Sequence, residues 1–254
     1  MRPAKAARQA KILDELQHAP SLRVVDLAQR LNVSTETIRR DLDEMTGRGE
    51  LNRTYGGAIR PPAEEPAVSV RHALFVGERS RIARAVIPSI HDAKVLMIGS
   101  GATTVHLARR IAATMRDVTV ITHSFGVATV LSINPTIRVV LAPGDYHPTE
   151  GATIGAHAVE FLGRFQADVA LIGASGLGTS GPSEALIDVA AVYSAMCRSA
   201  ARRIVVADHS KFGQTYPAVY ATWAEIDTLA TDAAPGRDLG DCLRRASVKI
   251  LLAP

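Results

Sequence analysis

The chain has 254 residues, of which 47% are hydrophobic and only 4% aromatic. This length favours two domains of unequal size, and the hydrophobic fraction is sufficient for a packed core. Because Val, Ile, Leu and Ala must fill that core, the composition favours an α/β fold in which helices cover parallel strands. No stretch approaches the ~18 apolar residues of a membrane span, and no secretory signal is recognisable, so we expect a cytoplasmic protein that does not bind membranes.

The formal net charge is +4, and most of it lies near the N-terminus, where residues 1–60 carry eleven Lys and Arg against eight Asp and Glu. A basic N-terminal module suits a polyanionic partner, although a charge this modest needs a motif to support it. Cys197 and Cys242 lie far apart, without metal-ligand spacing. We therefore expect free, buried thiols, and neither a disulfide, a zinc site nor a cofactor.

Apolar residues recur at helical spacing in three segments of the first 50 residues, and the third segment places Ile38, Leu42 and Met45 on one face. Glycines directly after that segment end the helix, and residues 51–59 are predicted to form two short strands joined by a Gly-Gly turn. Three helices followed by a β-ribbon are the layout of a winged helix-turn-helix. We assign this domain to residues 1–60.

A proline-rich stretch, Arg-Pro-Pro-Ala-Glu-Glu-Pro, follows at residues 60–66 and predicts an extended linker, which we place at residues 61–70. From residue 71 to residue 254, apolar β-branched runs alternate with helical patterns, which is typical of right-handed βαβ units and a mostly parallel sheet. The predicted strands are 94–98, 118–122, 137–141, 168–173, 203–207 and 226–230.

The third helix is a candidate for reading DNA. Ser34 is a suitable N-cap, and Val33 and Ile38 flank it as a hydrophobic staple. Recognition helices contact DNA with the N-terminal half of their exposed face. The alternative is an ordinary solvated helix in which Arg39 pairs with Asp43 and Arg40 with Glu44. With the apolar positions inward, the outward residues are Glu36, Thr37, Arg39, Arg40, Asp43 and Glu44.

A longer pattern favours the DNA-reading interpretation. It consists of Val24-Val25-Asp26-Leu27-Ala28, Leu31-Asn32-Val33-Ser34, Thr37-Ile38-Arg39-Arg40-Asp41-Leu42 and Tyr55-Gly56-Gly57-Ala58. This segment closely resembles the N-terminal domain of DeoR-type transcription regulators. The resemblance implies that Thr35 to Arg40 enter the major groove of double-stranded DNA, while Arg53 and Tyr55 lie on the wing near phosphates. Arg can bind guanine bidentately or neutralise a phosphate, so the residue types fit both tasks.

The loop after the first strand of the larger domain reads Gly99-Ser100-Gly101-Ala102-Thr103-Thr104 and opens into a helix. Backbone N–H groups and hydroxyls at a helix N-terminus favour an anion, although a simple tight turn would look the same. The resemblance to DeoR-type regulators continues here, and it implies a fold similar to ribose-5-phosphate isomerase and a small phosphorylated metabolite as effector. Further residues matched to the family pattern are His123, Ser124, Gly176, Asp208 and Lys211.

Two positions depart from that family pattern. An acid is usual where this chain has Gly99, and a Lys is common where Tyr193 aligns. Losing a carboxylate and a cation alters sugar recognition or leaves the pocket degenerate. Lys211 is then the main remaining cation, so we expect it to balance the charge of an anionic effector at the carboxyl edge of the sheet. The alternative for Lys211 is a solvated loop lysine.

Two enzyme functions are alternatives to the interpretation as a regulator. The run from Gly176 to Gly181 has GxGxxG spacing, but Asp208 lies 27 residues beyond it, where a dinucleotide site expects about 20. We therefore interpret the run as a mobile glycine loop beside the effector.

A phosphosugar isomerase is the second enzyme alternative. It needs a positioned base, and only His209 and Glu184 are near the candidate site. We interpret His209 as a loop histidine bonded to backbone and Glu184 as an acid at a helix N-terminus.

The resulting prediction is a DNA-binding transcription regulator, specifically a repressor of metabolic genes, and not an enzyme. Because helix-turn-helix proteins read paired half-sites, we expect a homo-oligomer, either a dimer or a tetramer.

Overall fold

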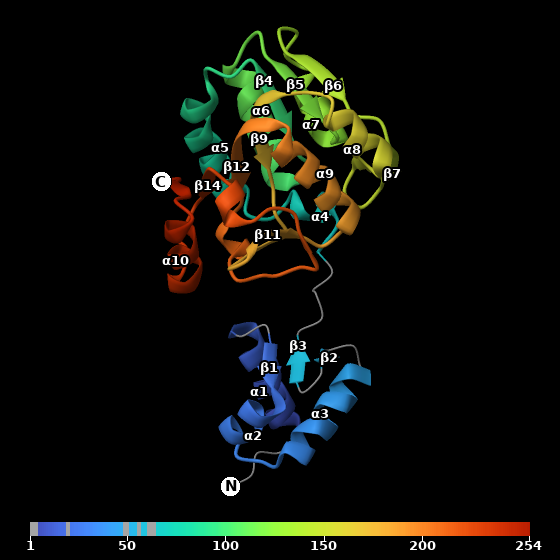
Figure 1. Ribbon diagram of the computed structural model, residues 1–254, viewed down its shortest axis with the longest axis vertical. Coiled ribbons are helices and arrows are strands. Elements are labelled where there is room, and N and C mark those ends of the chain that lie inside the picture. Colours follow the sequence, from blue (N-terminus) through green and yellow to red (C-terminus); the bar gives the residue numbers. More distant parts are fainter. Residues whose placement is uncertain (1–4, 19–20, 48–50, 55–56, 60–64) are drawn as a thin grey trace. The chain divides into compact units, whose positions relative to one another are not determined.

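The computed structural model describes residues 5–18, 21–47, 51–54, 57–59 and 65–254. The chain divides into two compact units, Met1–Glu64 and Glu65–Pro254. Figure 1 shows the helices and strands of each unit. Within the described ranges, no helix combines the length and the apolar character that crossing a membrane requires.

The first unit is a small helical domain with a β-ribbon. Its helices are α1 (Lys5–His18), α2 (Val24–Arg30) and α3 (Thr35–Gly47), and its antiparallel sheet has the order β1 (Ser21–Arg23), β3 (Gly57–Ile59), β2 (Asn52–Thr54). The three helices and the ribbon expected from the sequence are confirmed. Strand β1 was not anticipated, because three residues are too few to show alternation. The core contains Ile12, Leu22, Val24, Leu27, Ala28, Leu31, Ile38, Leu42, Met45 and Leu51.

A nearly buried ion pair ties α1 to α3. The guanidinium of Arg8 donates to both carboxylate oxygens of Asp41, with Nη2 3.0 Å from Oδ1, and the two side chains are only 11% and 3% exposed. A second pair between the same helices, Lys5 with Glu44, is exposed to solvent. Removing the Asp41 carboxylate would take from a nearly buried guanidinium the charge that compensates it, which is costly. We therefore expect the inner pair, Arg8 with Asp41, to stabilise the contact between α1 and α3 more than the exposed pair does.

We predict that Asp41→Asn lowers the free energy of local unfolding of α1 and α3 by about 2 to 3 kcal/mol, since it removes the charge that compensates Arg8. Glu44→Gln is the matched control, and at an exposed pair it should cost less than about 1 kcal/mol. Native-state hydrogen exchange of the amides in both helices measures the two changes. Equal protection in both variants would contradict the importance of the inner pair.

The second unit is built on a seven-stranded sheet in which every neighbouring pair is parallel. The mostly parallel α/β fold predicted from the sequence is therefore confirmed. The one strand of this sheet that the sequence did not reveal is an edge strand at the C-terminus with exposed side chains. The order is β15 (Lys249–Leu252), β14 (Thr228–Thr231), β12 (Ala200–Val206), β9 (Ala167–Ile172), β4 (Val95–Ile98), β5 (Thr119–Thr122), β6 (Arg138–Leu141).

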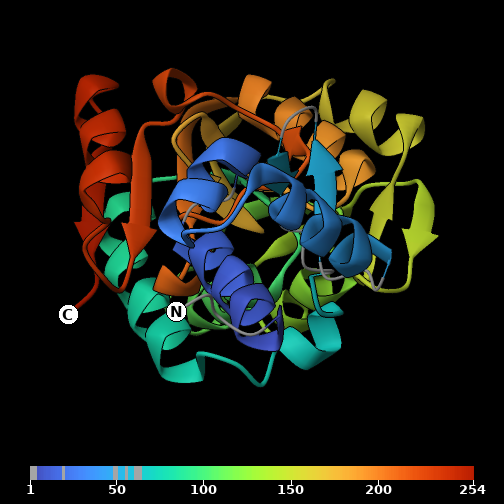
Figure 2. The same cartoon turned by 90° about the horizontal axis from the view of Figure 1, so that it is seen from below.

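Helices cover both faces of this sheet. Apolar side chains alternate between the faces along each strand, so that Leu96 and Ile98 join one core cluster and Met97 joins the other. One cluster includes residues of α5 (Val76–Ile90), α6 (Ala102–Thr114) and α7 (Phe125–Leu131), and the other includes residues of α8 (Ala156–Leu162), α9 (Ile187–Arg198) and α10 (Arg237–Arg245). Figures 1 and 2 both place α10 at one end of this unit and the hairpin β7 (Asp145–His147) to β8 (Ala152–Ile154) at the other.

Short elements surround the carboxyl ends of the strands. They are α4 (Val68–Arg71), the antiparallel strands β10 (Gly176–Gly178), β11 (Gly181–Glu184) and β13 (Ala218–Val219), and the 3-10 turn η1 (His209–Lys211). A second 3-10 turn, η2 (Trp223–Glu225), precedes the amino end of β14. Residues 65–70, expected to be linker, belong to the second unit. Residues 72–75 separate α4 from α5.

The glycine run that resembled a dinucleotide loop is a β-hairpin, so the predicted mobile loop is wrong. A Cβ on Gly176 would lie 2.4 Å from the carbonyl oxygen of Gln214, and one on Gly181, whose φ is +143°, would lie 2.1 Å from that of Ala221. Glycine is needed here because neighbouring backbone approaches closely. A dinucleotide site binds its pyrophosphate at the N-terminus of the helix that follows the glycine loop. This segment leads into strand β11 instead of a helix, so it lacks the structure that such a site needs.

Candidate DNA-binding surface and effector pocket

The N-terminal half of α3 presents polar side chains beside a firm helix start. Ser34 Oγ accepts the N–H of Thr37 at 3.2 Å, which confirms Ser34 as the predicted N-cap. Ile38 is fully buried, and Arg39 and Arg40 are exposed. Two arginines therefore project from the first turns of the helix, as the predicted recognition helix requires.

Both arginines contact the same acid, which lies earlier in the helix. Glu36 lies 3.3 Å from Arg40 Nε and 4.0 Å from Arg39 Nη1, and all three side chains are more than half exposed. The solvated-helix alternative names Asp43 and Glu44 as partners of these arginines, and does not name Glu36. Exposed pairs are weak, so a DNA phosphate or base can replace Glu36 at little cost.

The remaining residues assigned to DNA contacts are described less completely. Thr35 and Thr37 are half-buried at the start of α3. Arg53 lies in strand β2, and Tyr55 lies outside the described residues. The contribution of the wing to DNA binding stays a prediction.

A polar pocket lies at the carboxyl edge of the parallel sheet in the second unit. The loops that follow β4, β9 and β12 meet there, together with α4, α5 and α9. The structure thus brings the Gly/Ser/Thr loop, Tyr193 and Lys211 together, as expected from the strand order. The lining residues are Arg71, Arg79, Ser100, Gly101, Ala102, Thr103, Thr104, Glu150, Gly173, Ala174, Glu184, Tyr193 and Lys211.

His123 holds the Gly/Ser/Thr loop from behind. Its Nε2 accepts the N–H of Ser100 at 3.0 Å, and its Nδ1 lies 2.8 Å from the carbonyl oxygen of Thr153. Complete burial lowers the pKa of His123 to about 4, so the ring is neutral and its proton lies on Nδ1. His123 is therefore a positioning residue outside the pocket. The loop itself needs a glycine at Gly101, where φ is +119°.

The two departures from the family pattern occupy the same space. A Cβ on Gly99 would lie 2.8 Å from Cε1 of Tyr193, so a larger residue at position 99 and this ring exclude each other. The Tyr193 hydroxyl donates to the carbonyl oxygen of Ser100 at 2.7 Å and lies 3.1 Å from its Oγ. Burial raises the pKa of Tyr193 well above its usual value, so the hydroxyl keeps its proton.

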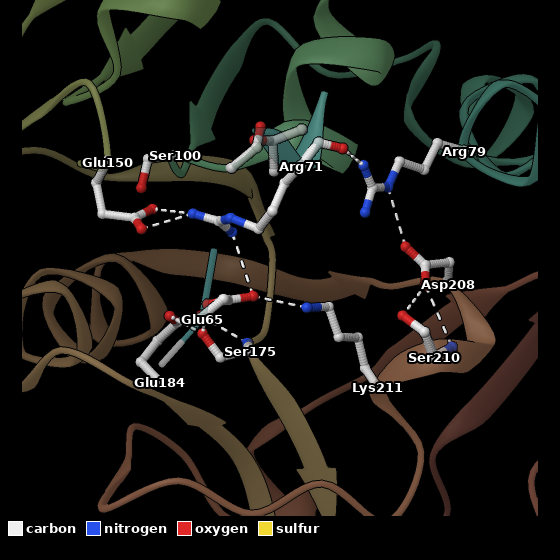
Figure 3. A network of polar contacts seen from close by, with 12 residues as sticks. Glu65, Arg71, Arg79, Ser100, Glu150, Ser175, Glu184, Asp208, Ser210 and Lys211 are labelled. Atoms are coloured by element: carbon white, nitrogen blue, oxygen red, sulfur yellow. Dashed lines mark hydrogen bonds and ion pairs between the residues drawn. The ribbon is translucent and has the colours of Figure 1, made fainter. Parts of the chain in front are cut away.

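The strongest electrostatic feature of the pocket is a buried cluster around Arg71. Arg71 Nη2 donates to both carboxylate oxygens of Glu150 at 2.5 Å, and Nη1 lies 3.3 Å from Glu65 Oε1. The same Glu65 oxygen accepts from Lys211 Nζ at 2.6 Å. Figure 3 shows Glu65 between Arg71 and Lys211. Lys211, predicted to meet an anionic effector, thus already holds a carboxylate.

Glu184 also lines this pocket, which corrects its interpretation as an acid at a helix N-terminus. It is the last residue of β11; its Oε1 accepts from the N–H of Ser175 at 3.0 Å, and its Oε2 lies 2.6 Å from Ser175 Oγ. Burial, and then the neighbouring charge of Glu65, raise the pKa of Glu184 to about 8. The sequence did not show this because β11 was not recognised as a strand.

Asp208 acts through Arg79. The fully buried Asp208 accepts from Arg79 Nε at 2.9 Å, and Arg79 also donates to the carbonyl oxygen of Arg71. His209 does not bond to backbone as expected, because its Nδ1 lies 2.7 Å from Oδ2 of Asp232. Asp208 therefore positions Arg79, which faces the pocket.

The remaining matched residues shape the fold around the pocket. Ser124 caps α7 by accepting the N–H of Val127 at 3.3 Å, and Gly176 allows the close backbone approach already described. The structure adds Glu65, Arg71 and Glu150, which sequence reasoning missed. Arg71 and Glu150 are 79 residues apart, so no local motif joins them. The thiols follow expectation only in part, because Cys197 is buried and Cys242 is half-buried, both without a disulfide.

Comparison with known proteins agrees with this two-part organisation. A model described as the DeoR-like helix-turn-helix domain matches residues 8–63, and one described as the DeoR C terminal sensor domain matches residues 75–233. The HTH-type transcriptional repressor GlcR of Bacillus subtilis (strain 168) is 32% identical over 247 residues, covering 96% of this chain and 95% of that protein. The glycerol-3-phosphate regulon repressor of Escherichia coli (strain K12) is 30% identical over 213 residues, covering 83% and 84%.

Among solved structures, ribose 5-phosphate isomerase A from Methanocaldococcus jannaschii is similar over 52% of each chain, with a TM-score of 0.38 and 18% sequence identity. 

The fold and the two sites define a transcription regulator in which a helix-turn-helix domain precedes a sensor domain for a small molecule. The matches over both domains show that the chain belongs to the DeoR family of transcription regulators, as its residues indicated.

We predict that Glu184→Gln becomes progressively more stable relative to the natural protein as the pH rises from about 5 to about 8. The folded state holds a proton on Glu184 up to a pKa of about 8, whereas the unfolded chain releases it near pH 4.5. Rising pH therefore favours unfolding of the natural protein through this group, by up to about 1.4 kcal/mol per pH unit, and glutamine removes this dependence. Urea unfolding at several pH values measures the difference, and a constant difference would contradict the raised pKa.

Proposed function

We propose that this protein is a repressor that binds operator DNA through α3 and responds to a small anionic effector in the pocket of the second unit. The observation that carries the DNA-binding part is the pair Arg39 and Arg40 on the exposed first half of a capped helix. The names of the two relatives above support repression. We also propose a cytoplasmic location, because the two relatives are repressors of bacteria, in which the chromosome lies in the cytoplasm.

Phosphorylated sugars or related metabolites are the effector class that we propose. The pocket joins two cations, Arg71 and Lys211, to the loop of Ser100 to Thr104, whose hydroxyl and backbone groups suit phosphate oxygens. The name of the glycerol-3-phosphate regulon repressor supports this class. A thermal-shift screen that compares sugar phosphates with the same sugars lacking phosphate tests it. Stabilisation by both forms alike would contradict an anion-based site.

We also propose a homo-oligomer, because paired half-sites bring two helix-turn-helix domains into one complex and raise their effective concentration.

The DNA probe is an operator selected from random duplexes. If Arg39 or Arg40 contacts a base edge, its replacement by Ala should weaken binding to this operator about ten- to a hundredfold, which corresponds to about 1 to 3 kcal/mol. A residue that contacts only phosphate should weaken selected and random DNA equally and reduce the salt dependence by about one ion. Arg30→Ala is the matched control, because Arg30 is an exposed arginine of α2 that pairs with Glu15. Fluorescence anisotropy measures all affinities. Unchanged binding in both α3 variants would remove α3 as the recognition helix.

Lys211→Met should weaken binding of the phosphorylated effector by about ten- to a hundredfold, because charge-assisted hydrogen bonds contribute roughly 1.5 to 3 kcal/mol. Lys249→Met is the control, since Lys249 is exposed on edge strand β15. Calorimetric titration with the metabolite found by screening gives both dissociation constants. If Lys211→Met and Lys249→Met bind equally well, Lys211 does not contact the effector.

An isomerase is the second candidate, favoured by one observation. Glu184 is a carboxyl group in the pocket with a pKa of about 8, and general bases often have such raised values. Both of its oxygens already bond to Ser175, which supports a structural role. We therefore expect no turnover of pentose phosphates, and measurable conversion that is lost in Glu184→Gln would establish the enzyme.

A further inference from the structure

We propose that the carboxylate of Glu65 is an internal anion that occupies the subsite of the effector's anionic group, between Arg71 and Lys211, and that effector binding displaces it. This inference rests on the proposed anionic effector. It assigns the anion to a subsite formed by α4 and η1, and it names the chain segment that must move when the effector binds.

The first support is the way in which Glu65 is bound. One oxygen contacts both Arg71 Nη1 and Lys211 Nζ, and the other accepts from the hydroxyl of Ser175. Two cations and a hydroxyl around two oxygens are the same groups that would bind a phosphate. The Glu65 side chain is only 4% exposed, although Pro66 beside it is exposed. The carboxylate of Glu65 is therefore buried at the start of the second unit, next to the exposed Pro66, and it occupies the position that we assign to the anionic group of a ligand.

The second support is the charge balance of the pocket. Arg71 is paired with Glu150, and Arg79 with Asp208, so Glu65 is the carboxylate that compensates Lys211. Burial opposes the charge on Glu65, but Arg71 and Lys211 outweigh it and lower the pKa of this carboxyl group. Removing Glu65 therefore leaves cationic charge uncompensated in a mostly buried site, which is unfavourable unless another anion enters. Glu65 and an external anion must exchange.

The neighbouring acid does not compete for the same cations. With a pKa of about 8, Glu184 is protonated at neutral pH. Its proton can be donated to Ser175 Oγ, which in turn donates to Glu65. The same chain of hydrogen bonds can end on a phosphate oxygen without a change in protonation. Ser175 therefore serves either anion.

The third support is that the rest of the segment is anchored independently of Glu65. The N–H of Val68 donates to the carbonyl oxygen of Thr149 at 2.9 Å, and Arg71 is fixed by Glu150 and by Arg79, which contacts its carbonyl oxygen. The carbonyl oxygen of Ala67 accepts the N–H groups of Val70 and Arg71 and so belongs to the start of α4, but Glu65 can leave with Pro66 while α4 stays in place. Glu65 is the first residue of the second unit, directly after the first unit in the chain. Displacement therefore changes the start of the connection to the DNA-binding domain.

Inorganic phosphate is the probe for the test, with the full-length protein. In Glu65→Gln the competing carboxylate is absent, so calorimetry should show phosphate binding about ten- to a hundredfold more tightly than in the natural protein, because a tethered group competes at a high effective concentration. Glu65→Asp keeps the charge on a shorter side chain and should give an intermediate affinity. Glu160→Gln is the control, since Glu160 is an exposed acid of α8, and it should match the natural protein.

A second measurement needs no variant. Hydrogen exchange in the natural protein should increase at the amide of Glu65 when phosphate is added, while exchange at residues 68–71 stays the same; Pro66 has no amide hydrogen. Equal phosphate affinity in Glu65→Gln and the natural protein, with weaker binding in Lys211→Met, would overturn the displacement and leave the proposed effector site standing. Phosphate binding that Lys211→Met does not weaken, or no binding in any form including Glu65→Gln, would overturn both.

Discussion

The guanidinium of Arg71 is the group on which the effector pocket depends. An arginine keeps its charge at any physiological pH, so a site that buries it must bring carboxylates to it. Here Glu150 and Glu65 meet that need, and they come from the turn before β8 and from the first residue of the second unit. Arg79 extends the same assembly by donating to the carbonyl oxygen of Arg71. One buried charge thus joins α4, α5, the β7–β8 hairpin and the chain entry into one structure.

The acids near Arg71 and Lys211 differ in charge because their surroundings differ. Glu65 lies between two cations, and its pKa falls despite burial. Glu184 is more deeply buried and faces a hydroxyl and an N–H, so its pKa rises to about 8. Two carboxyl groups that share Ser175 therefore hold one proton between them at neutral pH. The pocket has both an ionised acceptor and a neutral donor, and it stays balanced only while an anion lies between Arg71 and Lys211.

The sequence predicted what is encoded locally and missed what depends on distant contacts. Helix α3, its N-cap Ser34 and six strands of the parallel sheet follow from periodicity and flanking residues, and the gathering of Lys211 and the Gly/Ser/Thr loop follows from the parallel order. The Arg71–Glu150 pair spans 79 residues and has no pattern to reveal it. The hairpin from Gly176 to Gly181 was misread for the same reason, because its glycines are required by backbone from residues 214 and 221.

The two departures from the family pattern, at Gly99 and at Tyr193, depend on each other in the structure. The Tyr193 ring fills the space in which a side chain at position 99 would lie, so an acid at position 99 would require this ring to move. The Tyr193 hydroxyl already donates to the carbonyl oxygen of Ser100. The pair therefore stiffens the loop and offers little to a sugar hydroxyl. In the function that we propose, recognition then depends mainly on charge, through Arg71 and Lys211, which favours the anionic end of an effector over its polyol part.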